Sequence, residues 1–383
     1  MIDQNYLLEV LARMVQIDSR NPDLTDGAPG EAEIGAYVAG LMVELGLEVE
    51  TETLGEKRVN VVGIWRGTGN GRSLMLNGHL DTVGVEGMAE PYSGAVRDGK
   101  LYGRGSYDMK GSLAAMLAAT KALKEQGVAL AGDLLLTAVA DEEYASIGTE
   151  AIARRFTADA AIVTEPTHME IVCAHRGFVW YDVTVTGRAA HGSLYDVGID
   201  ANMRMGRFLA ELEKLEIVLR TERPLHPLTG YPSLHAATLH GGSGLSTYAD
   251  RCTLQIERRL NPGETEAQAT AELQAIIDRL VAADPTFRAT VTPLFSRTPL
   301  EAPADAPIVK LVDKVVSQKL GRPAAYAGMR GWTDAAILSD AGIDSLLLGP
   351  SGEGAHAAEE WVDTQSLLDF AEMLVTIVAE FCG

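Results

Sequence analysis

Five short stretches of the sequence contain the residue types that hold metal ions or move protons. They are His79-Leu80-Asp81, residues 103–111 around Asp108, Asp141-Glu142-Glu143, Glu165-Pro166, and residues 354–360 around His356. Neutral imidazole and carboxylate oxygen are common ligands of divalent metals. A carboxylate that holds no metal can act as a general acid or base. The stretches therefore suggest a metal centre with a proton-transferring group beside it.

Taken singly, each stretch has a plainer interpretation. The two histidines and Glu165 could be ordinary loop residues, and Asp108 could cap the helix predicted after it. The three adjacent acids that begin at Asp141 could form an exposed acidic loop. Adjacent carboxylates repel one another, however, and persist more readily where cations compensate their charge.

What joins the stretches is their position relative to predicted strands. Apolar runs predict buried strands over residues 73–76, 134–140, 160–163 and 345–348, and one of the stretches follows each strand. Asp108 lies at the start of a helix predicted over 109–126. Ligands of open α/β sheets bind beyond the carboxyl ends of the strands. We therefore expect these side chains to converge: His79, Asp108, Glu142, Glu143, Glu165 and His356.

The expected ligands are two imidazoles and several carboxylates, without a thiolate. This set favours Zn, Co, Mn or Ni over an iron–sulfur cluster or a thiolate zinc site. The three cysteines, Cys173, Cys252 and Cys382, form no CxxC pair and are odd in number. We therefore expect no disulfide framework and a reducing, cytoplasmic location.

The charge balance bears on the choice of partners. The chain has 32 Lys and Arg against 53 Asp and Glu, a net charge of −21. Binding to nucleic acid phosphates needs basic residues, so a nucleic-acid partner is not expected. No apolar run approaches the length of a membrane span, and no signal peptide is expected.

The hydrophobic patterns predict an α/β fold in two domains. Strands without a polar face that alternate with helices indicate a mostly parallel sheet flanked by helices. From Gly177 the pattern changes to strands with two different faces, as in 178–186. The order strand-helix-strand-strand-helix-strand then indicates a split βαβ domain. We expect a discontinuous catalytic domain, 1–176 and 294–383, with an inserted α+β lid domain, 177–293.

The five stretches, in this order, resemble the M20 family of metallopeptidases and deacylases over about residues 77–360. That family includes acetylornithine deacetylase, succinyl-diaminopimelate desuccinylase, aminoacylase and glutamate carboxypeptidase. The resemblance implies two divalent metals, zinc first, with cobalt or manganese as alternatives. It implies that His79 and Glu165 bind one metal, that Glu143 and His356 bind the other, and that Asp108 bridges them.

The resemblance also implies roles around the metals. Asp81 would orient His79, and Glu142 would be the general base. The inserted domain resembles the family's lid, through which a homodimer would form. Within it, His191 would stabilise the oxyanion, reaching the site of the other subunit, and Arg259 would hold a substrate carboxylate. Their plainer interpretations are a strand-end histidine and a solvated arginine.

Two positions depart from the family pattern. Ser246 stands where many members have an asparagine that contacts substrate, and Trp332 is bulky beside Thr333-Asp334-Ala335. Trp332 could narrow the acyl pocket or simply pack at a helix start.

The expected activity is cleavage of the amide bond of small N-acyl amino acids. A dipeptidase or a glutamate-carboxypeptidase-like exopeptidase is the alternative, because it cleaves the same type of bond. A non-catalytic metal-binding homologue is disfavoured, since it would not need Glu142 as a base. A phosphoesterase is disfavoured because no cluster of Arg or Lys accompanies the motifs.

Overall fold

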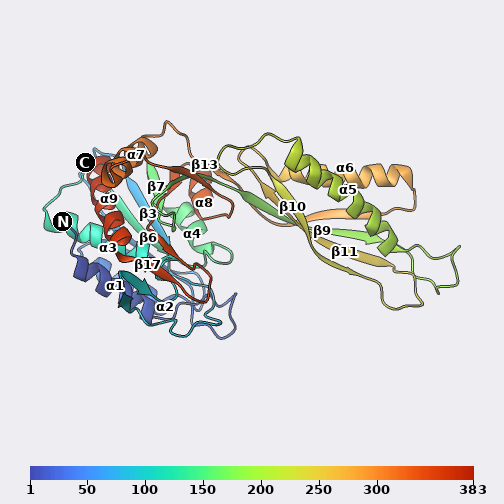
Figure 1. Cartoon of the computed structure of the whole chain (residues 1–383), viewed down its shortest axis with the longest axis horizontal. Coiled ribbons are helices and arrows are strands. Elements are labelled where there is room, and N and C mark those ends of the chain that lie inside the picture. The colour runs from blue at the N-terminus through green and yellow to red at the C-terminus, as the bar shows by residue number, and fades with distance from the viewer. The chain divides into compact units, whose positions relative to one another are not determined.

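A computed structural model describes residues 1–383, and the chain divides into two compact units (Figure 1). Unit 1 comprises Met1–Cys173, Ala302–Ala327 and Thr333–Gly383; unit 2 comprises Ala174–Glu301 and Gly328–Trp332. These units differ from the expected domains in three places: unit 2 begins at Ala174 and not at residue 177, it continues to Glu301 and not to residue 293, and it includes Gly328–Trp332. Strand β12 (Ala289–Arg297) continues past Pro293, where a β-bulge accommodates the proline that led us to end the domain there. Trp332 belongs to unit 2, not to the catalytic part.

The largest sheet has a parallel centre, as the apolar runs predicted. Its order is β1-β2-β6-β3-β7-β15-β8-β13, with β14 paired to β8. The pairs β6–β3, β3–β7 and β7–β15 are parallel, and the outer pairs are antiparallel. The central strands β3, β6 and β7 are buried along their whole length, which explains their lack of a polar face.

The strands of this sheet are β1 (Glu48–Thr53), β2 (Val59–Trp65), β3 (Leu74–His79), β6 (Leu134–Val139), β7 (Ala160–Val163), β8 (Ile171–His175), β13 (Leu300–Glu301), β14 (Tyr326–Met329) and β15 (Asp344–Leu347). The helices of unit 1 are α1 (Gln4–Gln16), α2 (Ala32–Glu44), α3 (Lys110–Glu125), α4 (Ile147–Arg155), α7 (Pro307–Leu320), α8 (Ala335–Asp340) and α9 (Thr364–Cys382). Helix α4 and strands β8, β13 and β14 were not expected from the sequence.

The helices of unit 1 pack along apolar faces whose spacing is visible in the sequence. Helix α1 starts at its cap Asp3, whose carboxylate accepts the N–H of Tyr6, and it buries Leu7, Leu11 and Met14 on one face. Helix α3 packs against α1, α9 and β3. Nearly all of its side chains are buried, and many are alanines, which allow close approach on several sides at once.

A second, small sheet in unit 1 was not expected, because its strands are only two or three residues long. Its order is β16-β17-β5-β4, formed by β4 (Val96–Arg97), β5 (Lys100–Tyr102), β16 (Gly352–Glu353) and β17 (Trp361–Asp363). Val362 pairs with Leu101 in an antiparallel register. Since β5 leads to the Asp108 segment and β16 and β17 flank the His356 loop, this sheet brings two distant parts of the chain together.

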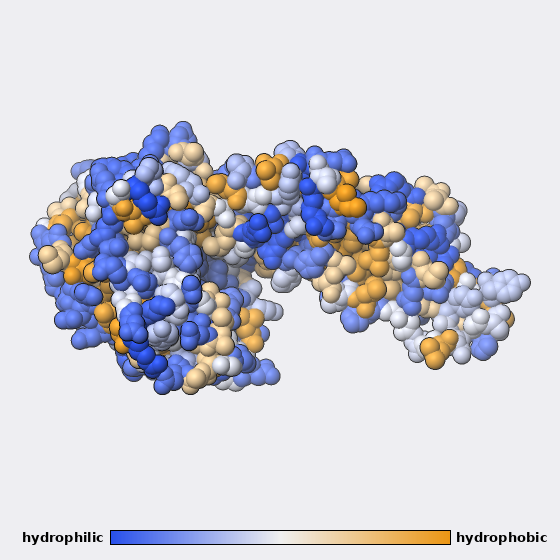
Figure 2. All heavy atoms as spheres, in the orientation of Figure 1, coloured by the Kyte–Doolittle hydropathy of each residue, from blue (hydrophilic) through white to orange (hydrophobic).

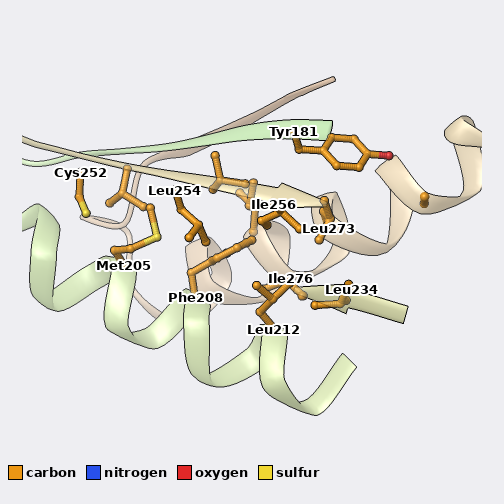
Figure 3. Packing of buried hydrophobic residues seen from close by; sticks show 14 of the residues in the cluster. Tyr181, Met205, Phe208, Leu212, Leu234, Cys252, Leu254, Ile256, Leu273 and Ile276 are labelled. Atoms are coloured by element: carbon orange, nitrogen blue, oxygen red, sulfur yellow. The ribbon is translucent and has the colours of Figure 1, made fainter. Parts of the chain in front are cut away.

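Unit 2 contains the predicted split βαβ arrangement. The chain runs through β9 (Gly177–Thr186), α5 (Ala201–Thr221), β10 (Ser233–Gly241), β11 (Arg251–Leu260), α6 (Glu266–Ala283) and β12, and the sheet order is β10-β11-β9-β12. Alternate residues of β9 are buried, as the two-faced pattern predicted. Figure 3 shows how Phe208 and Leu212 of α5 and Ile276 of α6 lie against Leu254 and Ile256 of β11.

The opposite face of this sheet and its edge strand β10 remain exposed. Most residues of β10 are accessible, and Leu239 is 52% exposed. Figure 2 shows hydrophobic surface among the hydrophilic residues of this unit. Across the whole chain, no helix combines the length and the apolar character needed to cross a bilayer.

Candidate active site

The parallel strands of unit 1 deliver three of the expected stretches to one edge of the sheet. Strand β3 ends on His79 itself, Asp141 to Glu143 follow β6, and Glu165 lies two residues after β7. The register pairs His79 with Val139 and Asn77 with Val163, so these strands end at nearly the same level. The loops of the small sheet supply Asp108 and His356.

Asp108 lies at the centre of the cluster. Its Oδ1 is 3.1 Å from Nε2 of His79, and its Oδ2 is 3.3 Å from Nε2 of His356. Oε2 of Glu143 lies 3.0 Å from Nε2 of His356, and Oε1 of Glu165 lies 3.8 Å from Nε2 of His79. Asp108 is not the helix cap: α3 begins at Lys110 after Met109, without a capping side chain.

Four of these residues and Glu142 form two overlapping groups that could hold cations, neither of which includes His356. One combines His79, Asp108 and Glu143, the other His79, Glu142 and Glu165, with ligand atoms of each group within 4.8 Å of one another. Oε1 of Glu165 is buried without a hydrogen-bond donor. Because a buried carboxylate needs a compensating partner, the residues present fit divalent cations.

Burial and mutual repulsion raise the pKa values of the acids in this cluster. Removal from water, followed by the charge of Glu165, raises the pKa of Glu142 well above its usual value. Burial raises the pKa of Glu165 to about 8. Burial, with the nearby charge of Asp108, also raises the pKa of Glu143. Protons on these groups reduce the negative charge of the cluster.

The histidines respond in the opposite sense to the same charges. Hydrogen bonds to Asp108 and then to Glu143 raise the pKa of His356 to about 10. Burial alone would lower the pKa of His79, but the hydrogen bond to Asp108 and the charge of Glu165 outweigh it and raise that pKa well above its usual value. Burial likewise opposes ionisation of Asp108, yet the bonds from His356 and His79 lower its pKa. The cluster therefore attracts positive charge.

Asp81 contacts His79 in a way that the sequence did not reveal. Nδ1 of His79 lies 2.9 Å from the main-chain oxygen of Asp81, whereas the Asp81 carboxylate is 3.6 Å away. That carboxylate instead accepts the backbone N–H groups of Glu142 (3.1 Å) and Glu143 (3.2 Å). Asp81 thus supports both the imidazole and the turn that carries two acids of the cluster.

Sequence reasoning missed a buried polar network behind Asp81. Nδ2 of Asn21 donates to Asp81 Oδ2 (2.8 Å) and to Asp141 Oδ1 (2.9 Å). Arg58 forms ion pairs with Glu31 and, at 2.8 Å, with Asp141. No local pattern reveals these residues, because they lie far from their partners in the sequence. Asn21 is at least 60 positions from Asp81 and Asp141, and Arg58 is at least 23 positions from either.

The two candidate residues of the inserted domain, His191 and Arg259, both lie in unit 2. His191 is exposed, with Nδ1 2.8 Å from Oγ of Ser193. Arg259 forms a 2.8 Å ion pair with Glu257, and its guanidinium lies 5.1 Å from the ring centroid of Phe178. Arg259 is therefore already paired with a carboxylate of its own sheet.

The two departures from the family pattern also have local partners in unit 2. The main-chain oxygen of Ser246 accepts the N–H of Gly192 at 2.7 Å, so Ser246 supports the segment that carries His191. Nε1 of Trp332 donates to the main-chain oxygen of Thr298 at 3.0 Å, and its ring lies edge-on to Phe178. Trp332 thus packs within unit 2.

Known proteins resemble this chain over most of its length. Residues 75–380 match peptidase family M20/M25/M40. An N-formyl-4-amino-5-aminomethyl-2-methylpyrimidine deformylase from Halalkalibacterium halodurans is 28% identical, covering 100% of this chain and 96% of the relative. An acetylornithine deacetylase from Myxococcus xanthus is 29% identical, covering 98% of each chain.

A solved structure has the same fold. The aminopeptidase PepT from Bacillus cereus superimposes with a TM-score of 0.82 over 100% of both chains, at 21% identity. Together with the family match over residues 75–380, this shows that the chain belongs to peptidase family M20/M25/M40 and is a metal-dependent hydrolase.

Proposed function

We propose that this protein cleaves the amide bond of small N-acyl amino acids, using two divalent metals and Glu142 as general base. The observation that carries the proposal is the placement of Asp108, whose two oxygens point to different histidines, His79 and His356. A carboxylate in this position could be shared by two divalent cations.

The remaining ligands are divided between the two metals as the resemblance to the family implies, and the closeness of Glu165 to His79 and of Glu143 to His356 supports this division. His79 and Glu165 are assigned to one metal, and Glu143 and His356 to the other. Oxygen and imidazole nitrogen ligands suit zinc, with cobalt or manganese as alternatives. Glu142 falls within the second candidate group, but the other carboxylates complete both ligand sets, which leaves Glu142 free to transfer protons.

Two such cations, when bound, would polarise the scissile carbonyl and lower the pKa of a water molecule. Glu142 then removes a proton from the attacking water and delivers it to the leaving amine. In the metal-free protein, burial and then the charge of Glu165 raise the pKa of Glu142, and its burial helps it to hold that proton between the two steps. The bonds from its N–H and that of Glu143 to Asp81 fix its position.

The substrate class is supported by the curated relatives, among them the acetylornithine deacetylase that is 29% identical over nearly the whole chain. A second candidate is an N-formyl amine, because the deformylase relative is similar over the same length. Both reactions release a small acyl group from a primary amine. Arg259 would hold a substrate carboxylate beside its ion pair with Glu257, since a guanidinium has five N–H donors.

We further propose that two copies of the chain associate through unit 2 and that His191 of each contributes to oxyanion stabilisation. The support is the exposed edge strand β10 with Leu239, since an unprotected edge can pair with a second strand. His191 carries no ion pair in its own unit and is exposed.

Replacing Glu142 by Gln should lower kcat by roughly 10²–10⁴-fold, because Gln cannot accept the proton of the water. The metal content, measured by atomic emission, should stay at that of the wild type, because Glu142 is not a ligand. Glu359→Gln changes an exposed acid and should leave both quantities unchanged. Near-normal turnover by Glu142→Gln would contradict the assignment.

Metal uptake by the stripped protein should release protons and should strengthen as the pH rises. In the metal-free protein the pKa of Glu165 is about 8 and that of His356 about 10, so both carry protons at neutral pH that a cation must displace. The apparent affinity should therefore rise through pH 8 toward pH 10. Calorimetry in two buffers of different protonation enthalpy measures the release, and a pH-independent affinity without proton release would contradict it.

A panel of N-acetyl, N-succinyl and N-formyl amines and dipeptides, tested on the zinc- or cobalt-loaded protein, separates the substrate classes. We expect kcat/KM for the best N-acyl amino acid to exceed that for any dipeptide by at least roughly tenfold, because pocket shape discriminates between them. A preference for N-formyl amines would support the second candidate instead. A dipeptide as the best substrate would overturn both.

Sedimentation should detect a dimer at micromolar concentration. Leu239→Arg should weaken it, because the charge would have to be buried at the shared edge, whereas Val96→Arg, at an exposed position of unit 1, should not. A wild-type protein that sediments as a monomer would contradict the proposed association.

A further inference from the structure

A buried ion pair lies next to the metal ligands but has no part in the proposed chemistry. Glu360 follows His356 by four residues, and its side chain is completely buried. Its Oε2 lies 2.6 Å from Arg104 Nη1, and the Arg104 side chain is only 3% exposed. Such a pair is costly to bury unless further hydrogen bonds satisfy both ions, so their other partners are informative.

The carboxylate of Glu360 binds the segment that carries Asp108. Its Oε1 accepts the backbone N–H groups of Tyr107 and Asp108, each at 3.0 Å. Its Oε2 accepts the N–H of Gly105 at 3.1 Å in addition to Arg104. Four donors from residues 104–108 therefore converge on one side chain of the His356 loop.

Arg104 makes the reverse connection. Its Nη2 donates to the main-chain oxygen of Ala357 at 2.9 Å, directly after His356. Its Nε donates to the main-chain oxygen of Gly84 at 2.9 Å, in the segment that follows His79. The main-chain oxygen of Glu360 also accepts the N–H of Gly103 at 3.1 Å. The pair thus ties together three segments that carry ligands.

We propose that Glu360 and Arg104 are positioning residues that set the placement of Asp108 relative to His356 and thereby the affinity of the metal held by Glu143 and His356. The inference rests on the proposed dinuclear site. Of the ligands of that metal, Asp108 and His356 both lie on the joined segments. For the metal held by His79 and Glu165, only Asp108 is bound directly by Glu360, and the segment of His79 is contacted five residues away at Gly84, so the affinity for this metal should fall less.

Glutamine at position 360 would be close in size but could not replace the carboxylate. If its oxygen faced Tyr107 and Asp108, its NH₂ group would face the donors of Gly105 and Arg104. In the flipped orientation its NH₂ group would face the N–H groups of Tyr107 and Asp108. Either orientation sets donors against donors, which leaves buried groups unsatisfied.

The test is a zinc titration of the stripped full-length protein by calorimetry, with cobalt absorption spectra as a second measure of ligand geometry. Glu360→Gln should weaken binding of the metal held by Glu143 and His356 about 10- to 100-fold, the usual effect of losing a residue that orients metal ligands. The affinity for the metal held by His79 and Glu165 should change less. Excess metal should restore kcat with little change in KM.

Two matched variants separate positioning from general stability. Glu359→Gln alters the exposed neighbour in the same loop. Glu264→Gln alters a similar pair in unit 2, where Glu264 binds Arg258 at 2.7 Å and the N–H of Asn261 at 2.8 Å. We expect Glu264→Gln to lower the melting temperature without weakening either metal, and Glu359→Gln to change neither.

Arg104→Lys serves as the second variant if Glu360→Gln does not fold. Lysine keeps the charge but cannot reach Glu360, Gly84 and Ala357 together, because it lacks the fork of the guanidinium. Arg104→Lys should also weaken binding of the metal held by Glu143 and His356 more than binding of the metal held by His79 and Glu165. Unchanged affinity for both metals in the folded variant, with only a lower melting temperature, would overturn the proposal. A wild-type chain that binds one metal would instead overturn the dinuclear site.

Discussion

The crowding of carboxylates at the carboxyl edge of the main sheet is the constraint on which the site depends. Asp108, Glu142, Glu143 and Glu165 are largely removed from water, and the charges of neighbouring acids raise the pKa values of the three glutamates. Such a group is stable only with compensating positive charge. In the metal-free chain the protons on the histidines and on some acids supply it, and the same demand makes the cluster a receptor for divalent cations.

Buried residues around the cluster hold the proposed metal ligands in position. Asp81 holds the imidazole of His79 through its main-chain oxygen and the acidic turn through its carboxylate. Asn21 and Arg58 in turn hold Asp81 and Asp141 from segments far away in the sequence. On the other side, Glu360 and Arg104 join the segments of Asp108 and His356. The ligands are therefore held in place by buried polar contacts with residues behind the cluster.

The two units contribute different features to the protein. Unit 1 contains every proposed metal ligand, so the metal centre can form within one compact unit. Unit 2 offers an antiparallel sheet with one packed face, one exposed face and an exposed edge strand. Its aromatic and charged side chains, such as Phe178, Arg259 and Trp332, contact one another there.

The sequence by itself determined the elements with strong periodicity and the residues at their ends. Buried parallel strands need uninterrupted apolar runs, so β3, β6, β7 and β15 could be predicted together with the acids and the histidine that follow them. The tertiary structure alone decided what no local pattern records. The short strands of the small sheet have too few residues to show a period, yet they bring Asp108 and His356 within hydrogen-bond distance. The partners of Asp81 and Glu360 lie far away along the chain, because buried polar groups are satisfied by whichever donors the fold brings near.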